Sequence, residues 1–226
     1  MCARYTLTAP RPRVEDFLGA AGGDFLQPRF NVAPGQEVAV AVRAPSGARA
    51  IVPATFGFPP AASSGRAASA RMSNARVETA ADVAAFREAF AHRRVLVPAD
   101  GFYEWRRGRH GAEPYHVALP GGALFAFAGL LGPGGPAAAA RPSFAILTGP
   151  APRSLEELHA RAPILVAPEH FDAWLDPALG ERDRLVPLLR NAPADALHFR
   201  AVDPRVNDPR FDEPACLAPA PQLSLL

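Results

Sequence analysis

A cysteine stands at position 2, directly after the initiator methionine. Because its side chain is small, we expect Met1 to be removed, which would put a free α-amine and a thiol on Cys2. Such a 1,2-aminothiol traps aldehydes: the amine, with a pKa of roughly 7.7–8.0, forms an imine, and the thiol then closes a thiazolidine ring. The alternative interpretation is an ordinary cysteine near a chain start, and retention of Met1 would abolish this chemistry.

The basic residues restrict which amine can act. All 24 are arginines, and the sequence contains no lysine. Imine formation needs an uncharged primary amine, whereas arginine stays protonated. The N-terminus is therefore the one amine in the sequence suited to this reaction.

A carboxylate lies among aromatic residues in the motif Asp100-Gly-Phe-Tyr-Glu104-Trp105. An apolar setting suits Glu104 for general acid–base catalysis, and Trp105 offers a flat face for a base or a sugar. The alternative is that Glu104 points into solvent from the polar face of a strand.

Two further segments carry candidate polar groups. His159 precedes Arg161-Ala-Pro-Ile-Leu, where it is either a catalytic imidazole or a cap at a helix end. The segment 74–79 combines Asn74, Arg76 and a carboxylate, although Thr79 could simply cap a helix there.

Short β-rich runs, most of them bounded by Gly or Pro, must position these residues. They cover 37–43, 50–58, 94–105, 115–119, 123–131, 143–148, 164–166 and 196–202. We expect a single α+β domain over 1–226, built on a mixed or antiparallel barrel-like sheet with a few short flanking helices.

Helical spacing appears at 80–92, 168–175 and 182–190, and a capping-box pattern at Ser154 predicts a helix that carries His159 at its far end. The segments 59–70 and 132–140 are typical of surface loops. The final residues, 214–226, are expected to be weakly ordered.

Composition excludes several classes of protein. Cys2 and Cys216 are too few for a disulfide framework and lack metal-ligand spacing, so no metal or cofactor is predicted. No secretion signal or long apolar run is present, which predicts a soluble protein that is neither exported nor bound to a membrane. A net charge of +2 does not select a partner.

Several motifs together resemble the SOS response-associated peptidase (SRAP) family. They are Cys2, the segments 29–36, 74–79 and 98–105, Thr148 with His159-x-Arg161-x-Pro163, and Val202-Asp-Pro-x-Val-Asn207. Their order and spacing agree with the family over roughly residues 2–210.

The resemblance implies a β-rich monomer that binds abasic sites in single-stranded DNA and links its N-terminal cysteine covalently to the deoxyribose. It also implies a bacterial cytoplasmic protein that acts at the nucleoid. The family's functional positions correspond to a nucleophile, Cys2; a residue orienting its amine, Asn74; an acid–base carboxylate, Glu104; a histidine near the sugar, His159; and DNA contacts at Arg4, Pro34, Arg76, Trp105 and Thr148.

The sequence departs from the family pattern at three places. Ala3 replaces a glycine after the cysteine, and Ala162 replaces a methionine before the proline. Phe56-Gly-Phe58 stands where the family has tryptophan, so base stacking is expected either to be weaker or to move onto these phenylalanines.

Two other functions use the same residues. A cysteine-dependent peptidase or N-terminal-nucleophile amidase would use Cys2 with its own amine as the base and could remove Met1 itself. A non-enzymatic module that binds single strands would explain the arginines and aromatic residues but would leave Cys2 without a role.

Overall fold

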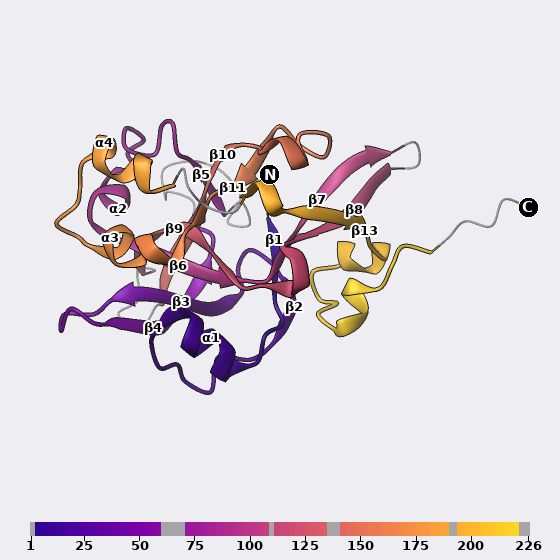
Figure 1. Ribbon diagram of the computed structural model, residues 1–226, viewed down its shortest axis with the longest axis horizontal. Helices are drawn as coiled ribbons and strands as arrows, with labels where there is room; N and C mark the ends of the chain where they lie inside the picture. The colour runs from indigo at the N-terminus through magenta and orange to yellow at the C-terminus, as the bar shows by residue number, and fades with distance from the viewer. Residues whose placement is uncertain (1–2, 60–70, 109–110, 135–140, 190–193, 222–226) are drawn as a thin grey trace, which may run out of the picture.

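Two β-sheets form the centre of the computed structural model, which describes residues 3–59, 71–108, 111–134, 141–189 and 194–221 (Figure 1). The smaller sheet is wholly antiparallel. Its strands lie in the order β13 (His198–Ala201), β8 (Gly111–Ala118), β7 (Gly101–Gly108), β1 (Arg4–Leu7) and β2 (Arg29–Val32).

The larger sheet is mixed. Its strands lie in the order β11 (Arg161–Pro163), β10 (Pro142–Pro150), β4 (Arg49–Phe56), β3 (Glu37–Arg43), β6 (Arg94–Ala99), β9 (Phe125–Gly134) and β12 (Leu165–Val166), with β5 (Asn74–Arg76) beside β10. Strand β10 is parallel to β4 and β5 but antiparallel to β9. Because β10 pairs with both β4 and β9, five strands close into a ring, which is the form the expected barrel-like sheet takes.

Short helices cover the sheets. The α-helices are α1 (Arg11–Leu18), α2 (Arg87–His92), α3 (Phe171–Leu175) and α4 (Arg182–Leu185). The 3₁₀ turns are η1 (Pro120–Gly122), η2 (Arg153–Leu155), η3 (Pro168–His170), η4 (Val186–Leu189), η5 (Ala194–Ala196), η6 (Pro204–Asn207) and η7 (Pro214–Leu217). In Figure 1, α2, α3 and α4 gather at one end of the molecule, and β7, β8 and β13 lie toward the other.

The apolar residues separate into clusters on the two sides of the larger sheet. Inside the ring, Phe56 stacks on Phe144 with ring centroids 5.1 Å apart, and Tyr5 and Phe102 of the smaller sheet join the same cluster. On the other side, Trp174 of α3 is fully buried, and its Nε1 donates to the Val95 carbonyl of β6. The inner face of the smaller sheet therefore packs directly onto the ring, so side chains on that face point toward the space between the two sheets.

The expected strand 94–105 is wrong as one element, because the chain passes from β6 in the larger sheet to β7 in the smaller one. The break falls at Asp100, whose carboxylate accepts hydrogen bonds from the Thr6 hydroxyl, from the backbone and hydroxyl of Thr8, and from the Ala9 backbone. These bonds hold the start of β7 beside the end of β1.

Two expected helices are shorter than the sequence pattern indicates. In 80–92 the α-helix begins only at Arg87, and Val83, which precedes it, is 41% exposed. At Ser154 the structure has a 3₁₀ turn instead of an α-helix. The Ser154 hydroxyl is buried without a hydrogen bond to any described residue, so the capping box does not form.

The expectation of a weakly ordered end fails for the first part of 214–226. Residues Pro214–Leu217 form η7, and Cys216 is fully buried against Tyr103 and Val206. Residues 222–226 lie outside the described residues, as does most of the loop expected at 59–70.

Candidate functional site

Glu104 lies on the inner face of the smaller sheet. It sits in β7 opposite Tyr115 of β8 and is only 5% exposed. Its neighbours Tyr103 and Trp105 pack in the cluster on the outer face, because successive side chains of a strand alternate. Glu104 and Trp105, adjacent in the sequence motif, therefore work on opposite sides of the sheet.

His159 lies in the loop between η2 and β11 and is half-buried. Its Nδ1 accepts a hydrogen bond from the Arg161 backbone N–H at 2.9 Å and lies 3.1 Å from the Arg161 carbonyl oxygen. In the neutral ring this arrangement puts the proton on Nε2. Arg161 is the first residue of β11, so the bond is to a strand and not to a helix end, which removes the helix-cap interpretation.

Glu104, His159 and Arg161 line one small recess, called here the Glu104 recess. Its other walls are apolar: Phe102, Val117, Leu155, Leu158 and Ala162. A carboxyl group and an imidazole that face one small, largely apolar space are suited to proton transfer.

Arg161 is a polar member of the recess that the sequence analysis named only within a motif. Its guanidinium forms two hydrogen bonds of 2.9 Å to the Glu78 carboxylate and a third, of 2.7 Å, to the Thr148 carbonyl. The hydrogen bonds from Arg161 are the main reason why the pKa of Glu78 is lowered. Arg161 Nε is buried without a hydrogen bond to a described residue. The signal that could have identified it is its spacing of two residues from His159, which lets the backbone of one residue bind the side chain of the other.

Asn74 and Arg76 lie in β5, paired with Ile146 and Thr148 of β10. Since paired residues share a face and Ile146 belongs to the ring cluster, Asn74 lies on the inner face of the larger sheet. Its Nδ2 donates to Ser73 at 3.1 Å, and its Oδ1 is buried with no hydrogen bond among described residues. Arg76 is exposed, whereas Thr148 is fully buried, its hydroxyl 3.4 Å from the Ala75 carbonyl.

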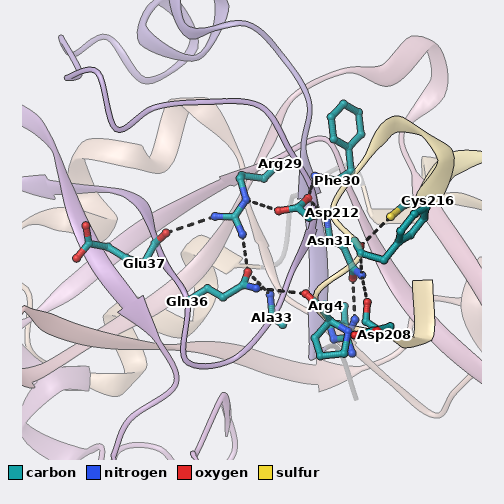
Figure 2. A network of polar contacts seen from close by, with 12 residues as sticks. Arg4, Arg29, Phe30, Asn31, Ala33, Gln36, Glu37, Asp208, Asp212 and Cys216 are labelled. Atoms are coloured by element: carbon teal, nitrogen blue, oxygen red, sulfur yellow. Dashed lines mark hydrogen bonds and ion pairs between the residues drawn. The ribbon is translucent and has the colours of Figure 1, made fainter. Parts of the chain in front are cut away.

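Arg4 is held by the far end of the chain (Figure 2). Its guanidinium donates to Asn31 Oδ1 at 2.8 Å and to the carbonyl oxygens of Val206 and Asn207 at 2.9 and 3.1 Å. Burial lowers its pKa, an effect that the charge of Asp208 partly offsets. In this structure Arg4 thus ties β1 to the C-terminal segment, a role that the sequence analysis did not foresee.

Asn31 completes this network from a fully buried position. Its Nδ2 donates to the carbonyl oxygens of Val206, Asp208 and Phe211 at 2.8–3.1 Å. The Asp212 carboxylate in turn accepts from the Asn31 backbone and from Arg29, as Figure 2 shows. The motifs at 29–36 and 202–207 therefore bind each other, and we call them, with residues 208–212, the Asn31 brace.

The remaining expected DNA contacts lie away from the recess. Trp105 is half-buried on the outer face, where its Nε1 donates to Asn207 Oδ1 at 2.7 Å and its ring lies 5.9 Å from the Arg4 guanidinium. Pro34 is exposed in the turn between β2 and β3. Cys2 lies outside the described residues, and the first strand starts two residues after it.

The two phenylalanines near the departure from the family pattern are core residues. Phe56 is fully buried against Phe144, and Phe58 is 4% exposed with its ring 5.3 Å from that of Phe86. Neither presents a face to a base, which overturns the expectation that stacking moves onto them.

The residues that the structure describes contain no group of three or more His, Cys, Asp or Glu side chains arranged to hold a metal ion. Within the same ranges, no helix is both long and apolar enough to span a membrane.

Comparison with known proteins gives a consistent result. The abasic site processing proteins YoqW and YoaM of Bacillus subtilis (strain 168) are 30% and 31% identical to this chain, with 95% and 93% of it aligned to 97% and 94% of theirs. A phage-related protein from Bordetella bronchiseptica superposes with a TM-score of 0.72 at 28% identity, covering 89% of this chain and 94% of its own. A protein from Bacteroides thetaiotaomicron shares the fold, with a TM-score of 0.79 at 20% identity over 97% of this chain and all of its own. Residues 1–209 match the family described as SOS response associated peptidase (SRAP). This chain therefore belongs to the SRAP family.

Proposed function

We propose that this protein captures abasic sites in single-stranded DNA by forming a thiazolidine between Cys2, exposed by removal of Met1, and the deoxyribose. The observation that carries the proposal is that Glu104 and His159 line the same recess. Relatives that align over nearly the whole chain are named abasic site processing proteins, which supports the same substrate.

Chain connectivity supports a position for Cys2 near this recess. Strand β1 begins at Arg4, which pairs with Tyr103, the residue before Glu104. Two residues of extended chain span at most about 7 Å, so Cys2 is tethered to the end of the sheet that carries Glu104. The buried Asn74 Oδ1 is an acceptor on the facing sheet, suited to orienting an amine.

The chemistry requires proton transfers at each stage. An abasic sugar is mostly a closed hemiacetal, so a base must remove the proton of its hydroxyl while an acid protonates the ring oxygen to give the aldehyde. The Cys2 amine then adds to the aldehyde carbon, and loss of water gives the imine. Addition of the thiol across the C=N bond forms the C–S bond and returns a proton to nitrogen. Glu104 transfers the protons in ring opening and imine formation. His159, with a proton on Nε2, donates that proton to a sugar or ring oxygen.

The exposed Arg76 is suited to a backbone phosphate, which would position DNA without reading its sequence. Pro34 and Trp105 are proposed contacts farther along the strand. Thr148 is buried, so we propose that it acts through the Arg161 guanidinium that its carbonyl holds.

The direct test is to incubate purified protein with a single-stranded oligonucleotide that carries one abasic site. A heat-stable band of reduced mobility is expected, and it should be absent with Cys2→Ala or with an oligonucleotide lacking the abasic site. Cleavage of peptides by the wild-type protein, without any stable band, would favour the peptidase instead. Reversible binding without either product would favour a simple single-strand-binding module.

A further inference from the structure

A second polar recess lies on the outer face of the smaller sheet, and we call it the Arg200 recess. Its polar lining comes from six residues: Thr8, Arg13, Asp100, His116, His198 and Arg200. His116 of β8 pairs with Tyr103 and Arg200, whereas the neighbouring Tyr115 pairs with Glu104. Because neighbours alternate, this recess and the Glu104 recess open on opposite faces. Its volume of about 330 Å³ is at the low end for small-molecule sites.

The recess carries an excess of available positive charge. Neither Arg13 nor Arg200 forms an ion pair with any residue that the structure describes, although Arg13 makes one long hydrogen bond, of 3.3 Å, to the Gly122 carbonyl. Asp100 is the one acidic residue of the lining, and both its oxygens already accept hydrogen bonds from residues 6–9. The carboxylate is therefore committed to the fold, while the guanidinium groups keep donors for a ligand.

The histidine at the back of the recess is neutral. Thr6 Oγ1 lies 2.7 Å from Asp100, to which it donates, and 3.2 Å from His116 Nε2, which must therefore donate to Thr6. Burial, reinforced by the charge of Arg200, lowers the pKa of His116 to about 4. The positive charge at neutral pH thus lies on the arginines at the mouth, and the back wall is a fixed hydrogen-bonded chain.

The rim of the recess is open. Gly121 and Gly122 have φ values of 66° and 64°, a region that disfavours side chains, and no atom lies within 4 Å of a Cβ placed on either. A ligand therefore meets only backbone on that side.

We propose that the Arg200 recess binds a phosphate group. Arg13 and Arg200 come from different elements, α1 and β13, so each can donate to a different oxygen of a tetrahedral anion. The group can come from the DNA backbone or from a free phosphate anion. The DNA source rests on the proposed function, whereas binding of free phosphate does not.

If the phosphate comes from DNA, it lies well apart from the abasic site. Arg200 lies three strands from Arg4, in the register Arg4–Tyr103–His116–Arg200, and at about 4.8 Å between neighbouring strands this is a separation of about 14 Å. A backbone phosphate in the recess would belong to a nucleotide several positions from the one captured, so short oligonucleotides should not reach it.

The first experiment titrates inorganic phosphate into the whole protein at neutral pH and follows the ring signals of His116 and His198 by NMR. A saturable shift is expected for wild type and for Arg184→Gln, an exposed arginine of α4 outside the recess. The shift should be lost in Arg13→Gln/Arg200→Gln. This readout does not depend on any reaction with DNA.

The second experiment measures the affinity of the same variants for single-stranded oligonucleotides of increasing length. If the DNA backbone is the source, Arg200→Gln should weaken binding only of the longer strands and reduce the salt dependence by about 0.7 in slope, with the crosslinking rate at saturating DNA unchanged. Lost phosphate binding with unaltered DNA affinity would assign the recess to a free anion. Unaltered binding of both phosphate and DNA in the double variant would overturn the proposal, whether or not the protein crosslinks DNA.

Discussion

The two faces of β7 differ in how their polar groups are used. On the outer face, the Tyr103 hydroxyl donates to the Phe30 carbonyl at 2.7 Å and Trp105 donates to Asn207, and both acceptors belong to the Asn31 brace. On the inner face, Glu104 lies in a recess with mainly apolar walls, near an Arg161 Nε that has no hydrogen bond to a described residue. The polar groups on the outer face of β7 stabilise the fold, whereas Glu104 on its inner face lines the recess for which we propose proton transfer. One short motif thus serves both purposes, because its side chains alternate.

The largest effect is expected from Asn31→Ala, which tests the structural side of this comparison. The substitution leaves Arg4 and three carbonyl oxygens without their partner on the fully buried Asn31, so the free energy of unfolding should fall by about 3 kcal/mol. Chemical denaturation measures this change. Asn207→Ala, which removes one exposed hydrogen bond, is the matched control and should cost less than about 1 kcal/mol. Full stability of Asn31→Ala with lost crosslinking would show that Asn31 belongs to the chemistry.

The next effect concerns Glu104→Gln on the inner face. Because the amide cannot transfer a proton as the carboxyl does, crosslinking to abasic DNA should slow about 100-fold or more, while the melting temperature stays close to that of wild type. Single-turnover gel assays give the rate. Glu113→Gln, in the neighbouring strand and exposed, should react at the wild-type rate. Equal slowing in the two variants would remove the special role of the recess.

A smaller change is expected for His159→Gln, since the amide oxygen can still accept from the Arg161 backbone. Crosslink formation should slow about tenfold, and release of a preformed crosslink should slow too, because a catalyst acts on both directions of a step. Loss of labelled DNA from the isolated adduct, in the presence of an excess of a competing abasic oligonucleotide that captures the released protein, reports the release rate. His92→Gln, a histidine at the end of α2, is the control. Release at the wild-type rate would make His159 a structural residue.

The smallest effect is expected for the exposed Arg76. Arg76→Ala should weaken binding of all single-stranded sequences alike, by the loss of one phosphate contact, and lower the slope of log affinity against log salt by about 0.7. Titrations at several salt concentrations test this, with the exposed Arg87→Ala of α2 as control. A loss confined to particular bases would contradict a phosphate contact.

Local patterns predicted part of this fold. The β-rich run at 37–43 matches β3, whose residues 38–41 are all buried, as a continuous apolar run in a central strand predicts. Strands β1, β2 and β5 have only three or four residues, too few for the period to appear. The break at Asp100 was also hidden, because the carboxylate binds residues more than 90 positions away.

The candidate site, like the fold, could be predicted from the sequence only in part. Residue types and the family resemblance singled out Glu104 and His159, but their common recess depends on β7 packing against the loop before β11. The contacts of Arg4 could not be predicted, since its partners Val206 and Asn207 lie about two hundred residues along the chain. The burial of Phe56 and Thr148 likewise follows from the closed ring and not from their own segments.

The central claim is that Cys2 is the nucleophile served by the Glu104 recess. Wild-type protein should be reacted with an abasic oligonucleotide, digested, and mapped by mass spectrometry, with borohydride-trapped samples of wild type and Cys2→Ser in parallel. We predict a mature chain that begins at Cys2 and one adduct, on the N-terminal peptide. In Cys2→Ser the reducible imine should remain while the stable adduct is lost. An adduct at any other residue, or a crosslinked chain that retains Met1, would contradict the account.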